Sequence, residues 1–549
     1  MNHTYLTSWL VLWTVCGSTA IQAEEFFVGG DSAHVSINAA LSVAEDGDLV
    51  IVRPGRYEET IETRAPGVTI RAAEGGEVLV TTPGYVLRVR HERITVEGLT
   101  LDGQFSDRDG VQVRGESHGL TLRNVEVRNV GSDCVDMGSQ RDVTIEGCLI
   151  HHCLLAEGPN CDEPNCRGDA HGIAGAAMRN LTVRDTEIHT FSGDALQLDA
   201  GRNEPGWSGL VIEGCRIWLG PLTQAVGGFA AGIIPGENAL DTKTSNTVME
   251  PAEVTVRNTH VWGFRGGLIG NMSAFNLKEN VRVHLHRVTV SDSEIAFRLR
   301  GRTGSRPRGA QVTISNAVVY NVDKVVRYED DIDVVRMYNT TLGGDIGRLF
   351  QDASQSGRIE GRNVLVQRDA LPEQLLGGRN LAVNAACFVD PRQGNYQLMP
   401  DCAAIDTGEM LADVTVDRLG ISRPQGVGWD IGAYEFCDDS CRGAEPDAGN
   451  SDGGFNGPDR GGLDAGASAA DASRPSVDGT SPLDVGAQLM DGSDLHAQDV
   501  STVADALVEP AKKSGSGGCS QGADRSGVTL LVLLLFTGLR RRGTPRKGW

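Results

Sequence analysis

The feature that most constrains the fold is a short segment that recurs along the middle of the chain. In each copy a few β-branched or aliphatic residues lead into a turn residue that is Asn, Asp or Gly, and a second β-prone stretch follows. The turn residues are Asn124, Gly147, Asp185, Gly214, Asn258, Asn316, Asn339 and Asn363. Asn124 lies 23 residues before Gly147, and Asn339 lies 24 residues before Asn363, a period typical of solenoids. Strands this short cannot bury a face alone, so they must stack on the equivalent strand of the next copy.

This stacking predicts parallel β-coils with a column of aliphatic residues inside. The turn residues stack as well, and Asn and Asp suit such corners because they tolerate left-handed backbone geometry and bond nearby backbone. We expect an interrupted ladder of side-chain amides and carboxyls at the Asn and Asp turn positions. The copies are longer between Gly147 and Asn258, which places the extra residues in the central coils, where a solenoid keeps its binding surface.

The two ends of the repeat region carry further motifs. Residues 36–42 read as a short amphipathic helix, residues 46–57 as a turn, a strand and a Pro-Gly-x-Tyr corner, and residues 428–435 as a closing segment. Together with the repeat they resemble right-handed parallel β-helix proteins of the pectate-lyase-like superfamily. The resemblance covers about residues 25–436. We therefore predict an all-β, right-handed, single-stranded parallel β-helix solenoid with an N-terminal helical cap.

The remaining segments predict a four-part organisation. Residues 1–23 read as a secretory signal peptide, because an uncharged apolar stretch ends in a small-x-small cleavage site. The β-helix domain spans residues 24–436. Residues 437–515 are rich in Gly, Ala, Ser and Asp, and have too little apolar surface to order themselves, which predicts a disordered acidic linker.

The last segment, residues 516–549, holds Cys519, a short apolar run and the basic residues 540–542. It resembles the Cys-containing C-terminal sorting signal of myxobacterial surface proteins, although a plain soluble tail is the alternative. We therefore expect an exported protein that is associated with the cell surface or outer membrane through this tail, or secreted after tail processing. The partners expected on this basis are the cell envelope and an anionic polysaccharide, and the protein is expected to be a monomer.

The net charge and the cysteine content limit the class of partner and the type of site that the chain can have. The net charge of −23 argues against a nucleic-acid partner. Twelve Cys residues in an exported chain favour disulfides, and Cys387–Cys402 and Cys437–Cys441 are plausible pairs. Cys153, Cys161 and Cys166 fall in one long insert, where disulfide stapling is favoured over a zinc site that would include His151 and His152.

Aligning the copies by their turn residues brings a second set of positions into register. The aligned segments begin at Asp109, Asp133, Asp169, Asp194, Asn238, Gly266 and Ile295. We expect Asp133, Asp194 and Asn238 to share one side, with Asp136, Asp241 and Arg298 presented from the neighbouring segment. Carboxylates stacked about 5 Å apart repel one another unless a cation lies among them, and Ca²⁺ is the natural candidate. The alternative is a capping ladder in which each Asp only bonds backbone.

The stretch 236–244 resembles the Gly-x-Asp-x-Lys segment of calcium-dependent pectate lyases of the family 9 type. The resemblance implies that Lys243 is the catalytic base and that Asp194, Asp199 and Asp241 hold Ca²⁺, with help from Asp133 or Asp136. Asp241 and Lys243 stand at i and i+2, which puts them on one face of a strand. Gln197 occupies a position where a carboxylate would be expected, so the ligand set departs from the family pattern.

Neighbouring residues complete the expected site. Arg298 joins Lys243 as a catalytic residue, and Arg300 beside it could clamp sugar carboxylates, whereas the arginines at 302–308 favour a solvated loop. Asn238, Arg300 and His171 are the expected substrate-binding residues, and His171 bears a faint similarity to polygalacturonase-type hydrolases. Trp207, Trp218 and Trp262 are candidates either for sugar stacking or for packing at the coil edges.

These patterns favour a lyase that cleaves a uronate-containing anionic polysaccharide by Ca²⁺-assisted β-elimination. A non-catalytic surface solenoid that binds glycan or neighbouring cells would have the same ladders and tail. A glycoside hydrolase or an epimerase on the same scaffold is the third possibility, and it differs from a lyase in giving no unsaturated product.

Overall fold

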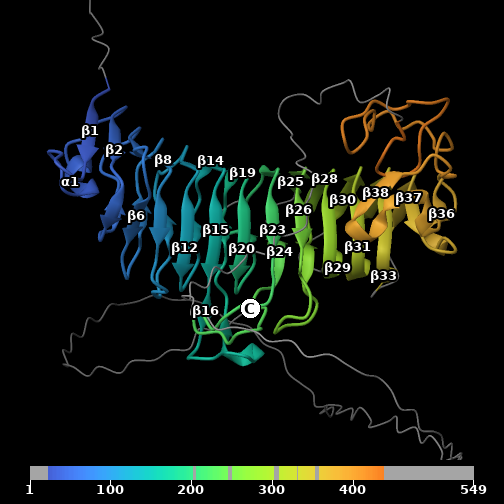
Figure 1. Ribbon diagram of the computed structural model, residues 1–549, viewed down its shortest axis with the longest axis horizontal. Coiled ribbons are helices and arrows are strands. Elements are labelled where there is room, and N and C mark those ends of the chain that lie inside the picture. Colours follow the sequence, from blue (N-terminus) through green and yellow to red (C-terminus); the bar gives the residue numbers. More distant parts are fainter. Residues whose placement is uncertain are drawn as a thin grey trace, which may run out of the picture. The chain divides into compact units, whose positions relative to one another are not determined.

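The coil architecture is visible in a computed structural model, which describes residues 23–201, 206–244, 250–301, 308–329, 332–352 and 358–437 (Figure 1). The described strands stack in three parallel ladders, named A, B and C in the order in which the chain meets them within a coil. The prediction of an all-β parallel solenoid is confirmed. The predictions for residues 1–22 and 438–549 lie outside the described residues.

Ladder A holds the strands that lead into the corner between ladders A and B. Its thirteen strands are β1 (Glu25–Val28), β2 (Leu49–Val52), β5 (Thr69–Ala72), β8 (Thr95–Glu97), β11 (Thr121–Arg123), β14 (Arg141–Glu146), β19 (Arg179–Arg184), β22 (Leu210–Glu213), β25 (Ala252–Arg257), β28 (Val281–His286), β30 (Gln311–Ser315), β32 (Val334–Tyr338) and β34 (Ile359–Arg362).

Ladder B begins directly after that corner. Its strands are β3 (Gly55–Tyr57), β6 (Val78–Thr81), β9 (Thr100–Asp102), β12 (Glu126–Val130), β15 (Leu149–Cys153), β20 (Glu187–Phe191), β23 (Arg216–Trp218), β26 (His260–Trp262), the first halves of β29 (Thr289–Arg300), β31 (Val318–Glu329) and β33 (Thr341–Asp352), then β35 (Leu365–Gln367) and β36 (Leu381–Val383).

Ladder C completes each coil. Its strands are β4 (Ile61–Glu62), β7 (Leu87–Val89), β10 (Val111–Val113), β13 (Val135–Met137), β18 (Ile173–Ala176), β21 (Leu196–Asp199), β24 (Asn238–Thr242), β27 (Ser273–Leu277) and the second halves of β29, β31 and β33. In these last three strands the corner between B and C opens into one continuous strand.

The interior is a set of aliphatic and aromatic columns, as the repeat predicts. One column of ladder C runs Val111, Val135, Ile173, Leu196, Leu240, Phe275, Phe297 and Val326, all fully buried. Phe275 and Phe297 stack with ring centroids 5.7 Å apart. Because each coil presents an apolar residue at the same register, every strand buries its inner face on the neighbouring coils.

The corner between ladders A and B has the geometry that the turn residues predict. Asn124, Asp185 and Asn258 have φ of 53°, 48° and 51°. Gly147 and Gly214 take the same position with positive φ, and a Cβ atom on Gly147 would lie 2.4 Å from Asn124 Oδ1. The predicted side-chain ladder is present only in part among the described residues. Asn363 Nδ2 donates to Asn339 Oδ1 over 3.4 Å. Gly147, Gly214 and Arg287, which has φ of 55°, interrupt the column at other corners, and Asn316 Nδ2 donates to Val416 O instead.

The described ends of the solenoid carry short elements. The single α-helix of the described residues, α1 (Ile37–Leu41), is capped by Ser36 and packs on β1, β2 and β4. Near the other end lie three 3₁₀ helices, two short strands and a long irregular segment at 399–437. The elements are η2 (Glu373–Leu375), η3 (Ala385–Cys387), η4 (Pro391–Gln393) and the antiparallel pair β37 (Phe388–Asp390) with β38 (Asn395–Leu398). Within the described residues, no helix is long and apolar enough to cross a membrane.

The cysteines weighed for a zinc site form disulfides, whereas Cys148 and Cys215 are free and buried. Cys387 pairs with Cys402 as predicted, Cys134 pairs with Cys153, and Cys161 pairs with Cys166. Cys437 is also disulfide-bonded, but its expected partner at 441 lies outside the described residues. Because the insert cysteines are oxidised to disulfides, they offer no thiolate to a metal.

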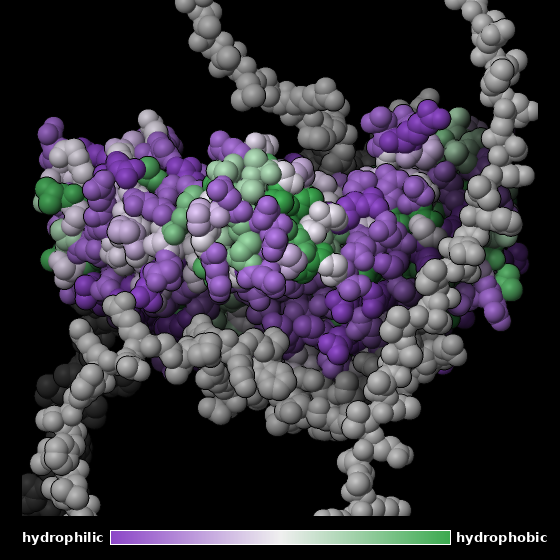
Figure 2. Space-filling view, turned by 90° about the horizontal axis from the view of Figure 1, so that it is seen from below, coloured by the Kyte–Doolittle hydropathy of each residue, from purple (hydrophilic) through white to green (hydrophobic). Residues whose placement is uncertain are grey.

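Three inserts at the corner between ladders B and C position the site, at residues 154–172, 219–237 and 263–272. The first contains β16 (Leu155–Ala156), η1 (Pro164–Cys166) and β17 (Arg167–Gly168). The inserts gather below the coils in Figure 1, and Figure 2 shows apolar residues over the middle of the molecule on this side. Arg167 joins the first two inserts, donating to Pro235 O over 2.7 Å and to Glu237 Oε1 over 2.7 Å.

Candidate functional site

A ladder of hydrogen-bond acceptors follows the corner where the inserts meet ladder C. Asp133 Oδ1 accepts from the His171 amide over 2.8 Å, and His171 Nδ1 accepts from the Asp194 amide over 2.8 Å. Asp194 Oδ1 accepts from the amide and the Nδ2 of Asn238, over 3.1 and 2.8 Å. Asn238 Oδ1 in turn accepts from the amide and hydroxyl of Ser273. We call these five residues the acceptor ladder, because each of the first four side chains accepts a hydrogen bond from the backbone of the next coil.

Burial shapes the electrostatics of the acceptor ladder. It raises the pKa of Asp133 to about 6, an effect that His171 opposes. The pKa of Asp194 lies well above its ordinary value, first because of burial and then because the Asp241 and Glu237 carboxylates repel its charge. Burial also lowers the pKa of His171, and since His171 Nδ1 accepts a hydrogen bond, the ring proton resides on Nε2.

These contacts make the capping alternative the better account of Asp194. Replacing Asp194 with alanine should lower the free energy of unfolding by about 1–3 kcal/mol, because two buried donors on Asn238 lose their acceptor. Asp194→Asn keeps an acceptor and should retain most of the stability. Chemical unfolding of both variants in chelator measures this directly.

The pH dependence of unfolding adds a second readout. The folded-state pKa of Asp194 lies above the ordinary 3.8, so the stability that Asp194 contributes is lost as the pH rises above that value. The Asn variant should lack this loss. Equal destabilisation by both substitutions at every pH would contradict the ladder role.

The outer face of ladder C carries two columns of chemically active side chains. The first column runs Gln112, Asp136, Ala174, Gln197, Asp241, Asn276, Arg298 and Arg327. The second includes Ala176, Asp199 and, one residue beyond the paired strands, Lys243 and Lys278, followed by Arg300 and Glu329. As expected from the aligned segments, Asp136, Asp241 and Arg298 share a column.

Lys243 lies at the centre of this face. Its Nζ is 2.5 Å from Gln197 Oε1 and 3.9 Å from Asp241 Oδ2. Its backbone carbonyl accepts a hydrogen bond from the Trp207 indole over 2.9 Å. Lys278 Nζ is closer to the same carboxylate, 2.8 Å from Asp241 Oδ2. Asp241 is therefore an ion-pair partner of two lysines, and its side chain is only 5% exposed whereas that of Lys243 is 35% exposed.

Cationic residues continue along the axis beyond the lysines. Arg298 lies two coils past Asp241 in the first column and pairs with Glu329 over 3.1 Å. Arg327 also reaches Glu329, over 3.4 Å, and Arg300 approaches it at 3.8 Å. Because one glutamate faces three guanidinium groups, the face is locally positive in a chain whose net charge is −23.

An acidic cluster lies on the opposite side of Lys243 along the axis. Oxygens of Asp109, Asp133 and Asp136 fall within 4.8 Å of one another. Arg114 pairs with Asp136, and Ser132 donates to Asp109 over 2.8 Å. Burial raises the pKa of Asp136, an effect that Arg114 opposes. Three clustered carboxylates supply the hard oxygen ligands that Ca²⁺ prefers, so this cluster fits the predicted metal better than other acids of the described residues.

The structure separates the residues that the sequence grouped as calcium ligands. Asp133 and Asp136 come together with Asp109, which the sequence placed in register without assigning it a role. Asp194 lies in the acceptor ladder, Asp241 pairs with lysines, and Asp199 accepts from the Gly201 amide. His171 and Asn238 also lie in the acceptor ladder, whereas Arg300 is on the cationic face.

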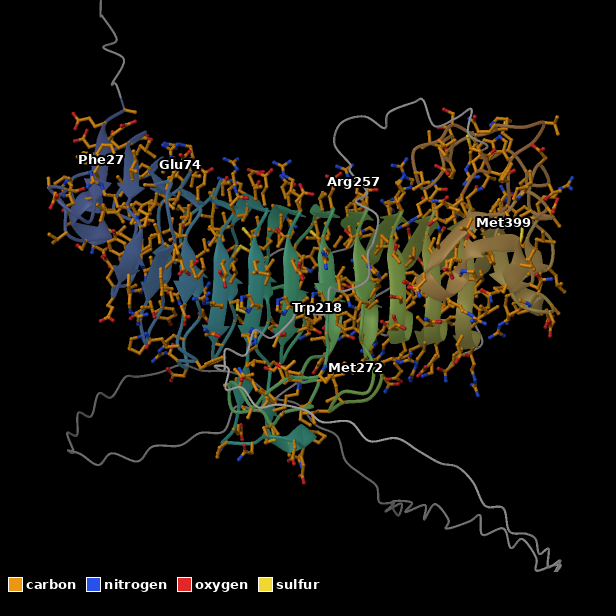
Figure 3. The ribbon with its side chains drawn as sticks, viewed as in Figure 1. Phe27, Glu74, Trp218, Arg257, Met272 and Met399 are labelled. Carbon is orange, nitrogen blue, oxygen red and sulfur yellow. A yellow bond between two sulfur atoms is a disulfide. The ribbon has the colours of Figure 1, made fainter. Side chains whose placement is uncertain are left out.

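A further correction concerns the aligned segments, and the contacts of the tryptophans show packing, one of the two roles expected for them. The segment at 266–269 lies in an insert, and the strand that occupies its expected register is β27. Lys278 follows β27 as Lys243 follows β24. Because the sequence alignment used residues 266–269 in place of β27, it did not identify Lys278. Trp207 is buried and fixes the Lys243 backbone, and Trp218 (labelled in Figure 3) and Trp262 stack on each other with centroids 5.9 Å apart.

One family model supports the fold. A family model described as a right handed beta helix region matches residues 88–229. The structure is similar to a solved pectate lyase, Pel9A, at 15% identity, 76% coverage of this chain, 97% coverage of that chain and a TM-score of 0.41. It is also similar to an alginate lyase from Paenibacillus sp. strain FPU-7, at 13% identity, 62% and 99% coverage and a TM-score of 0.38.

A polygalacturonase from Erwinia carotovora ssp. carotovora is similar at 13% identity, 63% and 97% coverage and a TM-score of 0.36. No curated protein matches the sequence. Because one fold hosts many activities, function has to be argued from the side chains on ladder C.

Proposed function

We propose that the chain binds a uronate-containing anionic polysaccharide along the outer face of ladder C and cleaves it by β-elimination with Lys243 as the base. The observation that carries this proposal is the run of cationic side chains beside Lys243. Lys278 shares Asp241 with Lys243, and Arg298 follows two coils later. A polymer with a carboxylate on each sugar meets complementary charge along this run.

The proposed step needs a base and a means to stabilise negative charge. The Lys243 ammonium first gives one proton to solvent. Its Nζ then takes the C5 proton of a uronate residue, the C5–H electrons form the C4–C5 double bond, and the C4–O bond breaks. The leaving oxygen takes a proton from water. Negative charge develops on the uronate carboxylate during proton removal, and the Lys278 ammonium is placed to stabilise it. Trp207 holds the Lys243 backbone and so keeps the base in position.

Calcium has a different place in this proposal from that expected from sequence. Asp109, Asp133 and Asp136 would hold it, and when bound it would supply a positive charge for a substrate carboxylate. Asp136 and Asp241 are three coils apart in the same column, which is about 14 Å at about 4.8 Å per coil. The metal would therefore grip a sugar a few residues away from the one that reacts.

Export and surface attachment through the C-terminal segment remain proposals, because they rest on residues 1–22 and 438–549. Export and surface attachment suit a polymer substrate, because the protein would encounter such a polymer outside the cell. The acidic composition of 437–515 would hold a tethered solenoid away from the envelope.

The test is ultraviolet detection of unsaturated uronate released by the full chain from pectate, alginate and glycosaminoglycans. Turnover of one of these would support the lyase and name its substrate. Saturated fragments or an epimerised polymer would identify a hydrolase or an epimerase. Binding to an anionic polymer without any turnover would favour the non-catalytic solenoid and overturn the proposal.

Removal of calcium gives a further prediction. A chelator should raise KM by about tenfold, as expected for loss of about 1.4 kcal/mol of binding, with little change in kcat because the contact is uniform between ground and transition states. Asp109→Asn should reproduce this effect, and calcium should then have none. Collapse of kcat in chelator, with KM retained, would instead place the metal beside Lys243.

A further inference from the structure

A group of arginines on the N-terminal coils is not used by the proposed function. Arg88 lies within β7 and Arg90 directly follows it, Arg114 directly follows β10, and Arg64 lies two residues beyond β4. Arg108 lies in the turn before β10. We call these five residues the arginine patch.

The register of the strands puts the patch on the outer face of ladder C. The first and last residues of β7 are fully buried, so Arg88 and Arg90 point outward. The pairing of β7 with β10 aligns Arg90 with Arg114, and the pairing of β4 with β7 brings Arg64 to the same position. This position belongs to the second column, which carries Lys243 further along the axis.

Three arginines of the patch face a single carboxylate. Glu62 Oε1 lies 2.7 Å from Arg88 Nη1, and Glu62 Oε2 lies 3.2 Å from Arg64 Nη2. Arg90 is exposed, and within the described residues its side chain has no ion-pair partner. The guanidinium group of Arg90 is therefore available to an anion from solvent, and so is the exposed side of Arg64.

The other two arginines have one carboxylate each. Arg108 Nε lies 3.6 Å from Asp107 Oδ1, and both side chains are more than half exposed. Arg114 pairs with Asp136, so the patch adjoins the acidic cluster. Five guanidinium groups thus pair with three carboxylates, which leaves an excess of two positive charges.

We propose that the arginine patch is a remote subsite that binds further acidic units of the same anionic polysaccharide, an inference that rests on the proposed function. The patch shares a face with the reactive residues, because the second column runs from Arg64 to Lys243 and Lys278. A polymer that lies along ladder C therefore meets positive charge on both sides of the acidic cluster. Guanidinium groups bind carboxylates through paired hydrogen bonds, which suits the acidic sugars of such a polymer.

The distance between the patch and the base makes binding depend on chain length. Five strand pairings separate the coil of Arg90 from that of Lys243, which is about 24 Å at about 4.8 Å per coil. One pyranose unit is about as long as one coil step, so a polymer needs about five units on this side of the reacting sugar to reach the patch. A second contact on the same chain adds affinity only when the chain spans both sites.

The test is calorimetric binding of the full chain to long-chain pectate and alginate, and to oligomers of three or four units of each. Chelator is present, so that only the cations of the protein contribute, and neutral dextran serves as the blank. The double variant Arg64→Gln with Arg90→Gln should bind the long chains about tenfold more weakly, a change of about 1.4 kcal/mol. Its affinity for the oligomers should not change. Both side chains are exposed and Glu62 keeps Arg88, so the fold should be retained.

A matched control removes the same two charges from ladder A. Arg123 and Arg257 make partly exposed ion pairs there with Glu146 and Glu213. The double variant Arg123→Gln with Arg257→Gln should bind long chains and oligomers as the parent does. Equal weakening in both double variants, or long-chain affinity that stays the same in the patch variant, would overturn the patch.

Unsaturated product, measured in parallel, separates this inference from the proposed function. Weaker long-chain binding by the patch variant, with no product from the parent, would keep the patch and overturn the lyase. Product from the parent, with long-chain affinity unchanged in the patch variant, would keep the lyase and overturn the patch. Failure of the parent to bind either polymer would overturn both.

Discussion

Replacing Lys243 with alanine should lower kcat on the substrate polymer by about 10³-fold, within the range that a positioned acid or base contributes. The reason is that the nearest amine of the described residues lies one coil further, at the same register of ladder C. Lys278 is the nearest, but its Nζ is held 2.8 Å from Asp241 Oδ2. The rate of unsaturated-product formation measures the effect, and binding of the polymer by the variant is measured alongside.

The substitution should leave the fold intact, so loss of turnover can be read as loss of chemistry. The Lys243 side chain is 35% exposed, and Asp241 keeps Lys278 when Lys243 is removed. Arg257→Ala is a suitable control, because Arg257 makes an exposed ion pair with Glu213 on ladder A and lies at the opposite edge of the coils from Met272 in Figure 3. Retention of kcat in Lys243→Ala would remove this residue as the base, whatever the substrate.

The fold could be predicted because its determinants are local and recur. A corner that needs positive φ favours Asn, Asp or Gly, as at Asn124, Gly147 and Asp185, and Arg287 is an exception. Once the corners are aligned, the register of the neighbouring strands follows, which is why Asp136, Asp241 and Arg298 fall in one column as expected.

The site was harder to predict because inserts break the register between ladders B and C. Ten residues at 263–272 precede β27, and a glycine pair within them resembles a coil segment. Because that glycine pair was aligned in place of Ser273, the alignment did not identify Lys278, the closest ion-pair partner of Asp241. A search for a second Lys at the position of Lys243, one coil further, would have found it.

Structural and metal-binding residues were also hard to tell apart, because both roles use side chains that accept hydrogen bonds. A backbone amide at a corner can donate its hydrogen bond to any acceptor. The side chains that accept from an amide of the next coil are Asp133, His171, Asp194 and Asn238. The same atoms would serve as ligands, so sequence alone offers no way to separate the two roles. Only the contacts show that the Asp194 carboxylate accepts hydrogen bonds from Asn238. Asp133, in contrast, belongs to both the acceptor ladder and the acidic cluster.

The second large effect is expected at Arg423, in the irregular segment near the C-terminal end of the solenoid. Its side chain is fully buried, and its Nη1 lies 2.7 Å from Glu435 Oε2, which is 1% exposed. Nη2 donates to Gly432 O over 3.0 Å and to Asn316 Oδ1 over 3.3 Å, so Arg423 ties this segment to a corner residue of the coils. Arg423→Met should destabilise the fold by about 3–5 kcal/mol, because it leaves the Glu435 carboxylate buried without its partner.

The pH dependence of this loss distinguishes an unpaired charge from lost packing. Burial raises the pKa of Glu435 to about 7, and Arg423 opposes that rise. Without Arg423 the folded-state pKa rises further above the ordinary 4.5, so the stability of the variant falls as the pH rises through this range. The urea midpoint of Arg423→Met should therefore lie closer to that of the parent at pH 5 than at pH 8. Adding Glu435→Leu should recover part of the loss at pH 8, because the charge is gone. An equal loss at both pH values, with no recovery in the double variant, would mean that Arg423 contributes by packing alone.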